Sequence, residues 1–199
     1  MKIISITNNY GNQAGHTITP AAFIIPDSAI LKDGKPFFIP DFSEAFTFCP
    51  SLIVRINRLG KNISCKFAHR YYDAVTLGLT VHAENIDNHS QTEGIENSIA
   101  NTFDGSAILG EFNDIEKFGD INNLKLTTNI NGETVSEFNT GKMIHNIDFL
   151  IEYLSKYFTL KIGDLIYTGS PVESKQTISF NQIITASIND TEVLNFKTK

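Results

Sequence analysis

The sequence is poor in several residue types, and each shortage excludes a class of protein. Its 199 residues contain no tryptophan, only two cysteines and a 19% share of charged residues. Two cysteines cannot form the disulfide framework of a small secreted protein. The longest purely apolar run, residues 21–25, is far shorter than the roughly 20 residues that a transmembrane helix requires. We therefore predict a cytoplasmic protein that does not enter a membrane.

Basic residues are also scarce. Lys and Arg total 16 against 22 Asp and Glu, which gives a formal net charge of −6. Nucleic-acid binders concentrate Lys and Arg to contact phosphate groups, so this balance argues against a nucleic-acid partner. The chain also lacks a Gly-rich phosphate loop ending in Lys-Ser/Thr and a Gly-x-Ser-x-Gly nucleophile elbow.

Short apolar or alternating runs between turn residues predict a domain that is mainly β. We expect strands over residues 2–7, 22–25, 51–59 and 162–168, and hairpins over 124–138 and 184–196. Asn131-Gly132 lies at the first hairpin turn, where the backbone needs a positive φ. Apolar residues at helical spacing predict helices over residues 63–75 and 147–158. The sparsely apolar stretch over residues 85–101 is typical of a loop or of a short helix over an opening.

The densest group of potential metal ligands comprises His82, Glu84, Asp87 and His89. If residues 80–84 are extended, His82 and Glu84 project to the same face, two residues apart. That geometry could hold zinc or manganese. A solvated polar loop is the simpler interpretation, because ligand-type residues are common on loops.

One segment carries a family signature. Residues 160–171 read LKIGDLIYTGSP and closely resemble the L-x-x-G-D-x-I-x-T-G-T-P segment of the fumarylacetoacetate hydrolase family. Asn9-Tyr10 resembles the N-terminal Asn-Tyr of that family, and residues 23–31 its F-L-K-P-x-x-A-L stretch. Residues 103–107 resemble the segment after its catalytic lysine, and residues 129–132 its hairpin turn. Because these motifs occur in the family's order over nearly the whole chain, the sequence is identified as a member.

The resemblance implies a mixed α/β fold, predominantly β: a mixed β-sandwich roll with a few short helices. It implies a single domain over residues 1–199, in which residues 1–45 form the usual N-terminal lead-in segment, and it implies a homodimer. It also implies a Mg²⁺ or Mn²⁺ site that polarises a 1,3-dicarbonyl or 2-oxo acid for C–C cleavage, decarboxylation or isomerisation. The resemblance implies a pocket that includes Asn9, Tyr10, Thr168, Gly169 and Ser170. The thiol of Cys49 is a further pocket candidate.

The metal ligands of the family are replaced in this chain. The family's Glu-x-Glu pair falls on Cys49 and Ser51, and its Asp falls on Thr80; no carboxylate occurs between Glu44 and Asp73. Hard divalent cations favour carboxylate oxygens. A thiol and two hydroxyls do not replace three negative charges, so we expect no metal or other cofactor at this position.

Three further family positions are also replaced. Gln13 stands where the family has a His that acts as general acid or base. Asn101 stands where it has a Lys that steadies a developing enolate, and Glu84 where it has the Arg of a carboxylate clamp. The main hypothesis is therefore a non-catalytic relative that keeps the fold and a pocket for a small 2-oxo acid or dicarbonyl ligand.

The alternative hypothesis is an active but divergent hydrolase, decarboxylase or isomerase of acylpyruvate-like or oxaloacetate-like substrates. Such an enzyme would use Mg²⁺ or Mn²⁺ relocated to the group of His82, Glu84, Asp87 and His89, or it would use Cys49 as a nucleophile. The alignment itself makes one structural prediction: Cys49, Ser51 and Thr80 converge at one pocket.

Overall fold

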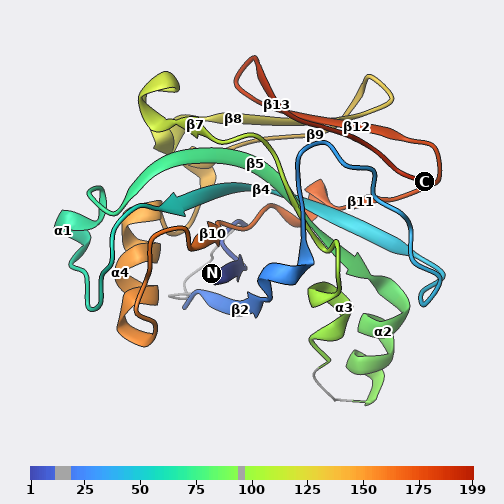
Figure 1. The fold of residues 1–199 in the computed structure, drawn as a ribbon, viewed down its shortest axis with the longest axis horizontal. Coiled ribbons are helices and arrows are strands. Elements are labelled where there is room, and N and C mark those ends of the chain that lie inside the picture. The colour runs from blue at the N-terminus through green and yellow to red at the C-terminus, as the bar shows by residue number, and fades with distance from the viewer. Residues whose placement is uncertain (12–18, 94–96) are drawn as a thin grey trace.

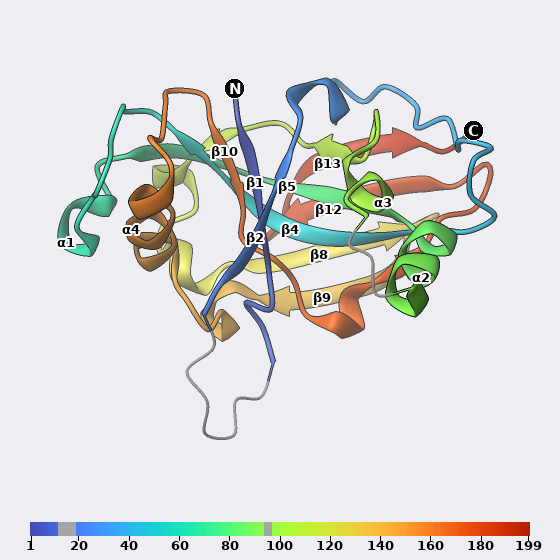
Figure 2. The same cartoon turned by 90° about the horizontal axis from the view of Figure 1, so that it is seen from below.

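The computed structural model describes residues 1–11, 19–93 and 97–199. Within these residues two β-sheets pack face to face, and helices gather at the two ends of the larger sheet (Figure 1). Helices α1 (Cys65–Ala68) and α4 (Ile147–Tyr157) lie at one end, and α2 (Glu84–Glu93) and α3 (Ile99–Thr102) lie at the other, as the second view also shows (Figure 2). The predicted mixed α/β fold with a predominance of β is confirmed.

Nine of the described strands form the larger sheet. They are β1 (Ile3–Thr7), β2 (Ala21–Ile25), β3 (Ile30–Leu31), β4 (Phe46–Ile56), β5 (Tyr72–Ala83), β6 (Ala107–Leu109), β7 (Asn113–Asp114), β10 (Leu165–Tyr167) and β11 (Gln176–Thr177). Its main path runs β2-β1-β10-β4-β5-β6-β3, while β11 pairs with β4 and β7 pairs with β5. The long antiparallel β4–β5 ladder is therefore the centre of the sheet.

The smaller sheet consists of two hairpins, and four of the described strands form it. They are β8 (Lys125–Ile130), β9 (Glu133–Asn139), β12 (Ile183–Ile188) and β13 (Thr191–Lys197), in the order β13-β12-β8-β9. Asn131 and Gly132 adopt φ angles of 52° and 86° at the β8–β9 turn. Both predicted hairpins are confirmed.

Alternation along β4 divides its side chains between two apolar clusters. Phe48 and Leu52 are fully buried in the large core, which contains residues of both sheets. Ile53 is also buried, but it belongs to a smaller cluster with residues of β1, β2, β6 and β10. Because successive residues of a strand point to opposite faces, Cys49 and Ser51 share the face of Ile53, away from the smaller sheet.

The helix predicted over residues 63–75 is wrong in its extent. Only Cys65–Ala68 is helical, and the chain then turns, with the N–H groups of Arg70 and Tyr71 donating to the carbonyls of Phe67 and Ala68 at 3.1 and 2.9 Å. From Tyr72 onwards the chain is strand β5, paired with β4. The ladder to β4, a contact distant in sequence, overrides the local helical spacing.

The helix predicted over residues 147–158 is present as α4. Asn146 caps it, since its Oδ1 accepts a hydrogen bond from the Phe149 N–H at 2.9 Å. Where it is described, the stretch over residues 85–101 contains α2 and α3, so the short-helix interpretation is confirmed there. No helix among the described residues is long and apolar enough to cross a membrane.

Candidate functional site

The candidate site forms where β4 changes its neighbour on one side. Strand β10 pairs with β4 from Ile53 to Arg55, and β11 pairs with it at Thr47 and Phe48. Between these two ladders the chain over residues 168–175 leaves the sheet as a turn. Pro50 lies in this interval, where its missing N–H costs no ladder bond to β10 or β11. The sequence therefore allows β4 to open on this side without a backbone penalty.

A cavity of about 200 Å³ lies at this opening, hereafter the Cys49 cavity. Its described lining includes Cys49 and Ser51 from β4, Thr80 and His82 from β5, and Lys175 from the turn. The C-terminal end of β1, Phe23 of β2 and the turn after β10 complete the wall. Pockets for drug-sized ligands measure roughly 300–1,000 Å³, so this cavity suits a more compact molecule.

The predicted convergence of Cys49, Ser51 and Thr80 is confirmed, because all three line the same cavity. Cys49 and Thr80 are direct partners across the antiparallel β4–β5 ladder. Ser51 follows Cys49 by two residues and so shares its face of the sheet. The Ser51 and Thr80 side chains are almost entirely buried.

Hydrogen bonds fix the turn after β10 to strand β4. The Ser51 Oγ accepts a hydrogen bond from the Gly169 N–H at 3.0 Å and donates to the Leu52 carbonyl at 3.1 Å. Thr168 Oγ1 donates to the same carbonyl at 3.1 Å. Gly169 has a φ of 86°, and a Cβ there would lie 2.9 Å from the Ile6 carbonyl oxygen. Glycine is therefore required at this corner of the cavity.

Asn9 supports the site from outside the described lining of the cavity. It is fully buried, and its Nδ2 donates to the carbonyls of Thr168 at 2.9 Å and His145 at 3.1 Å. Its Oδ1 accepts from the His145 N–H at 2.9 Å. These bonds join the end of β1, the turn after β10 and the approach to α4, so Asn9 and Thr168 hold the site in place.

The other predicted positions are dispersed. Ser170 lines the Cys49 cavity. Tyr10 instead lines a separate cavity of about 610 Å³, where its ring packs edge-on against Phe138 and burial raises the pKa of its hydroxyl. Asn101 lies on α3, outside the described lining of the Cys49 cavity. Gln13 lies outside the described residues.

The thiol of Cys49 is not activated. Burial raises its pKa, and the charge of Glu84 adds to the rise, while the charge of Lys175 and a hydrogen bond with Ser170 oppose it. The net direction is upward, and the thiolate is the nucleophilic form of cysteine. At neutral pH Cys49 therefore stays in the less reactive thiol form, which weakens the hypothesis of a Cys49 nucleophile.

Lys175 brings a positive charge to the cavity wall, and Glu84 pairs with it. The Lys175 Nζ lies 2.6 Å from the Glu84 Oε1, and the Thr47 hydroxyl donates to the same carboxylate. Burial alone would raise the pKa of the Glu84 carboxyl. Hydrogen bonds from Lys175 and Thr47, with the charges of Lys175 and His82, hold that pKa below its ordinary value. The Glu84 carboxyl therefore carries its negative charge at neutral pH.

Sequence patterns alone do not single out Lys175. It ends the segment VESK over residues 172–175, where the family resemblance implies a Gly-rich turn. The signal that points to it is the charge reversal at Glu84, because a half-buried carboxylate requires a nearby cation. Only the fold shows that this cation comes from residue 175.

The relocated metal site is not assembled by the described residues. Strand β5 ends at Ala83 and Glu84 begins α2, so His82 and Glu84 are not alternate residues of one strand, contrary to the expectation. His89 is exposed on α2, and the side chain of Asp87 is outside the described part of the structure. No three His, Cys, Asp or Glu side chains in the described part of the chain are grouped to hold a metal.

The donors of the Cys49 cavity do not fit the Mg²⁺ or Mn²⁺ ion that the family resemblance implies. Such ions favour carboxylate oxygens, and the described lining contains no Asp or Glu. The Ser51 hydroxyl is already bonded to Gly169 and Leu52, and Cys49 keeps its proton. The Lys175 ammonium adds a repulsive charge.

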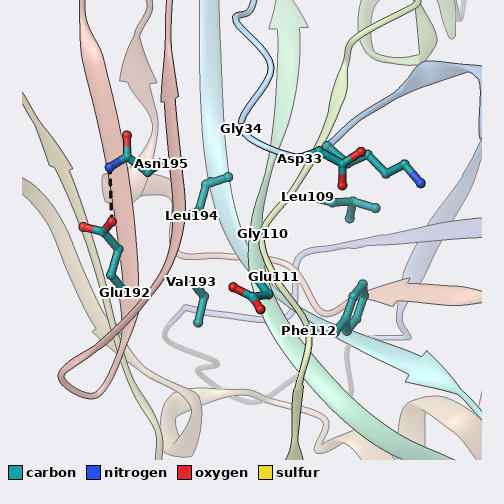
Figure 3. Close-up of a pocket in the computed structure, with 11 residues that line it drawn as sticks. Asp33, Gly34, Leu109, Gly110, Glu111, Phe112, Glu192, Val193, Leu194 and Asn195 are labelled. Atoms are coloured by element: carbon teal, nitrogen blue, oxygen red, sulfur yellow. Dashed lines mark hydrogen bonds between the residues drawn. The ribbon is translucent and has the colours of Figure 1, made fainter.

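A third cavity, of about 540 Å³, lies between β13, the end of β6 and the turn after β3 (Figure 3). Its lining includes the carboxylates of Asp33, Glu111 and Glu192, and Glu192 accepts a hydrogen bond from Asn195 at 3.1 Å. None of the predicted site residues belongs to its described lining. Its lining sets these three carboxylates against one lysine, Lys32, and this balance is unsuited to an anionic 2-oxo acid, so the Cys49 cavity is the better candidate.

Comparison with known proteins gives concordant matches. The sequence profile of the fumarylacetoacetate (FAA) hydrolase C-terminal family matches residues 3–197. The mitochondrial oxaloacetate tautomerase FAHD1 of Bos taurus is 28% identical over 202 residues, which cover 99% of this chain and 91% of the relative. The mitochondrial oxaloacetate decarboxylase of Dictyostelium discoideum is 30% identical over 176 residues, which cover 85% of this chain and 81% of the relative.

A solved structure gives the same result for the fold. A fumarylacetoacetate hydrolase family protein from Yersinia pestis superposes with a TM-score of 0.90 at 28% identity, over 100% of this chain and 92% of that chain. The family profile and the superposition therefore both span nearly the whole sequence. The chain belongs to the fumarylacetoacetate hydrolase family.

Proposed function

We propose that the protein binds a small 2-oxo acid in the Cys49 cavity and catalyses its keto–enol isomerisation without a divalent metal at the family's position. The relatives named for oxaloacetate tautomerase and oxaloacetate decarboxylase activity support the substrate class. The observation that carries the proposal is the lining of the cavity, where an imidazole, an ammonium and several hydroxyls meet in about 200 Å³.

Keto–enol isomerisation suits these groups because it requires only proton transfer. One proton leaves the carbon beside the carbonyl group, one proton reaches the carbonyl oxygen, and no carbon–carbon bond breaks. His82 is the candidate proton carrier, since histidine titrates near neutrality. The carboxylate of a 2-oxo acid adjoins the carbonyl carbon, so an ammonium that binds this carboxylate, here that of Lys175, can also stabilise negative charge that develops on the neighbouring enolate oxygen. Hydrolytic cleavage would in addition need an activated nucleophile, and the Cys49 thiol does not provide one.

A second candidate function is binding of the same class of anion without turnover. It is favoured by the replacement of the family's three carboxylates with Cys49, Ser51 and Thr80. The two functions share the cavity and the ligand class, so only an activity measurement separates them.

The test is to follow the ultraviolet absorbance of enol oxaloacetate as it equilibrates with the keto form. We expect EDTA-treated protein to accelerate equilibration, and we expect His82→Gln to abolish the acceleration. His69→Gln, which changes an exposed histidine beside α1, is the matched control and should retain activity. Acceleration that EDTA removes and Mg²⁺ restores contradicts the metal-free reaction. Saturable binding without acceleration identifies the second function instead.

A further inference from the structure

Lys175 is the one Lys or Arg in the described lining of the Cys49 cavity. That lining contains no Asp or Glu, and Glu84, the partner of Lys175, is outside it. The ammonium is therefore shared between a carboxylate on one side and the cavity on the other. The Lys175 and Glu84 side chains are 38% and 20% exposed, so water screens their attraction only in part.

Several contacts hold the Glu84 carboxylate in place. The Thr47 hydroxyl donates to it, and the Glu84 backbone N–H donates to the Ala45 carbonyl at 3.0 Å. Thr47 is itself the ladder partner of His82. The end of the β4–β5 ladder therefore fixes Glu84, and Glu84 in turn fixes the Lys175 ammonium at the cavity wall.

The cavity offers more hydrogen-bond donors beside the ammonium. Thr80 and Ser170 both line it and both carry hydroxyl groups. An ammonium has three N–H donors, and a carboxylate has about four lone-pair positions. Lys175 can therefore bind a ligand carboxylate while it keeps its bond to Glu84, and neighbouring hydroxyls can fill the remaining positions on the ligand.

We propose that Lys175 binds the carboxylate of the ligand, and that Glu84 is a positioning residue that holds the ammonium and limits its attraction for anions. The inference rests on the proposed binding of a 2-oxo acid in this cavity, but it does not require turnover. The Lys175 ammonium makes the site bind anions more tightly than uncharged molecules of the same shape. Dianions should bind more tightly than monoanions.

The test is calorimetric titration of the full chain with oxalate, a compact dianion that cannot enolise, and with oxamide, its uncharged analogue. We expect oxalate to bind and oxamide not to bind. Lys175→Met should weaken oxalate binding by about 10- to 100-fold, the loss typical of a hydrogen bond to a charged group. Lys175→Arg keeps the charge and should retain most of the affinity.

Two further variants separate a binding role from a structural one. Lys125→Met removes an ammonium that also pairs with a glutamate, Glu137, at 2.8 Å, and should leave oxalate affinity unchanged. Glu84→Gln keeps an oxygen that can accept a hydrogen bond from the Lys175 ammonium, so it keeps the positioning role, but it removes the negative charge. It should strengthen oxalate binding severalfold, whereas a residue that acts only through packing would weaken binding when changed.

The outcomes distinguish this inference from the proposed function. Unchanged oxalate affinity in folded Lys175→Met, or weaker binding in Glu84→Gln, overturns the inference. Oxalate binding that depends on Lys175, in a protein that does not isomerise oxaloacetate, supports the inference and overturns the proposed activity. Absence of any oxalate binding by the unaltered protein overturns the inference, whereas the proposed activity stands or falls on the acceleration of oxaloacetate equilibration.

Discussion

The Ser51 hydroxyl links strand β4 to the turn that closes the Cys49 cavity. Ser51→Ala would leave the Gly169 N–H without its acceptor, so we expect a loss of about 1–3 kcal/mol in the free energy of unfolding, measured by urea denaturation. Ser136→Ala is the matched control, because the buried Ser136 Oγ has no hydrogen-bond partner among the described residues. That change should be close to neutral. Equal losses in the two variants would contradict the role given to Ser51.

The raised pKa of Cys49 predicts slow alkylation. In a Cys65→Ser background, which leaves Cys49 as the one thiol, iodoacetamide should react more slowly with folded protein than with urea-unfolded protein near pH 7.5. The reason is that a raised pKa lowers the thiolate fraction at any given pH below it. The rate should keep rising with pH beyond about 8.5, the ordinary pKa of a cysteine. Faster reaction in the folded protein at pH 7.5 would show an activated thiol.

Much of the candidate site could be predicted from single residues, but its charge could not. Cys49, Ser51 and Thr80 follow from the resemblance to the family, and the β4–β5 register brings them together. Lys175 reaches the same cavity only through the path of the turn after β10. That path depends on contacts between distant segments, such as the one between Gly169 and Ser51.

Asn9 joins three elements, and its loss should loosen all of them. Asn9→Ala removes three hydrogen bonds, to His145 twice and to Thr168, at a fully buried position. We expect the free energy of unfolding to fall by at least about 2 kcal/mol, measured by chemical denaturation. Asn195→Ala, at an exposed residue of β13, serves as the control and should change stability by less than about 0.5 kcal/mol. A small effect at Asn9 would mean that the three elements hold together without it.

The elements fixed by local chemistry are the ones that the sequence predicts well. The β8–β9 hairpin follows from Asn131-Gly132, and α4 follows from its apolar stripe. The predicted helix over residues 63–75 fails because β4 pairs with the chain from Tyr72 onwards. Local spacing cannot report a partner that lies some twenty residues away, so it predicts a helix where the start of strand β5 lies.

One face of the larger sheet packs in the core between the sheets, and the other face carries the Cys49 cavity. A variant of a core residue can show that the two faces act independently. Leu77 on β5 is fully buried in the core between the sheets, on the face opposite Thr80. Leu77→Ala should lower the free energy of unfolding by about 2–5 kcal/mol, with oxalate affinity unchanged in the folded protein. Leu77→Ile, which conserves volume, should cost less than about 1.5 kcal/mol. A loss of oxalate affinity in proportion to stability would show that the core and the cavity are coupled.

The molecule as a whole is acidic, yet the described lining of its candidate site exposes a lysine and no carboxylate to the cavity. The net charge is −6, while the described lining of the Cys49 cavity has a lysine and no carboxylate. A cavity with a lysine and no carboxylate in its lining attracts an anion directly. A carboxylate-lined cavity would need a bound cation before it could attract an anion. The fold of the family is thus retained around a site whose electrostatics differ from those that the resemblance implies.

The most direct test of this account is calorimetric titration of EDTA-treated protein with oxalate, first without added metal and then with Mg²⁺ and Mn²⁺ in turn. If the cavity is a metal-free anion site, oxalate binds in EDTA, and its affinity for the protein, corrected for the metal–oxalate complex in solution, does not increase with either ion. Oxalate binding that appears only after Mg²⁺ or Mn²⁺ is added would contradict the account, because it would show that the anion reaches the cavity through a bound metal.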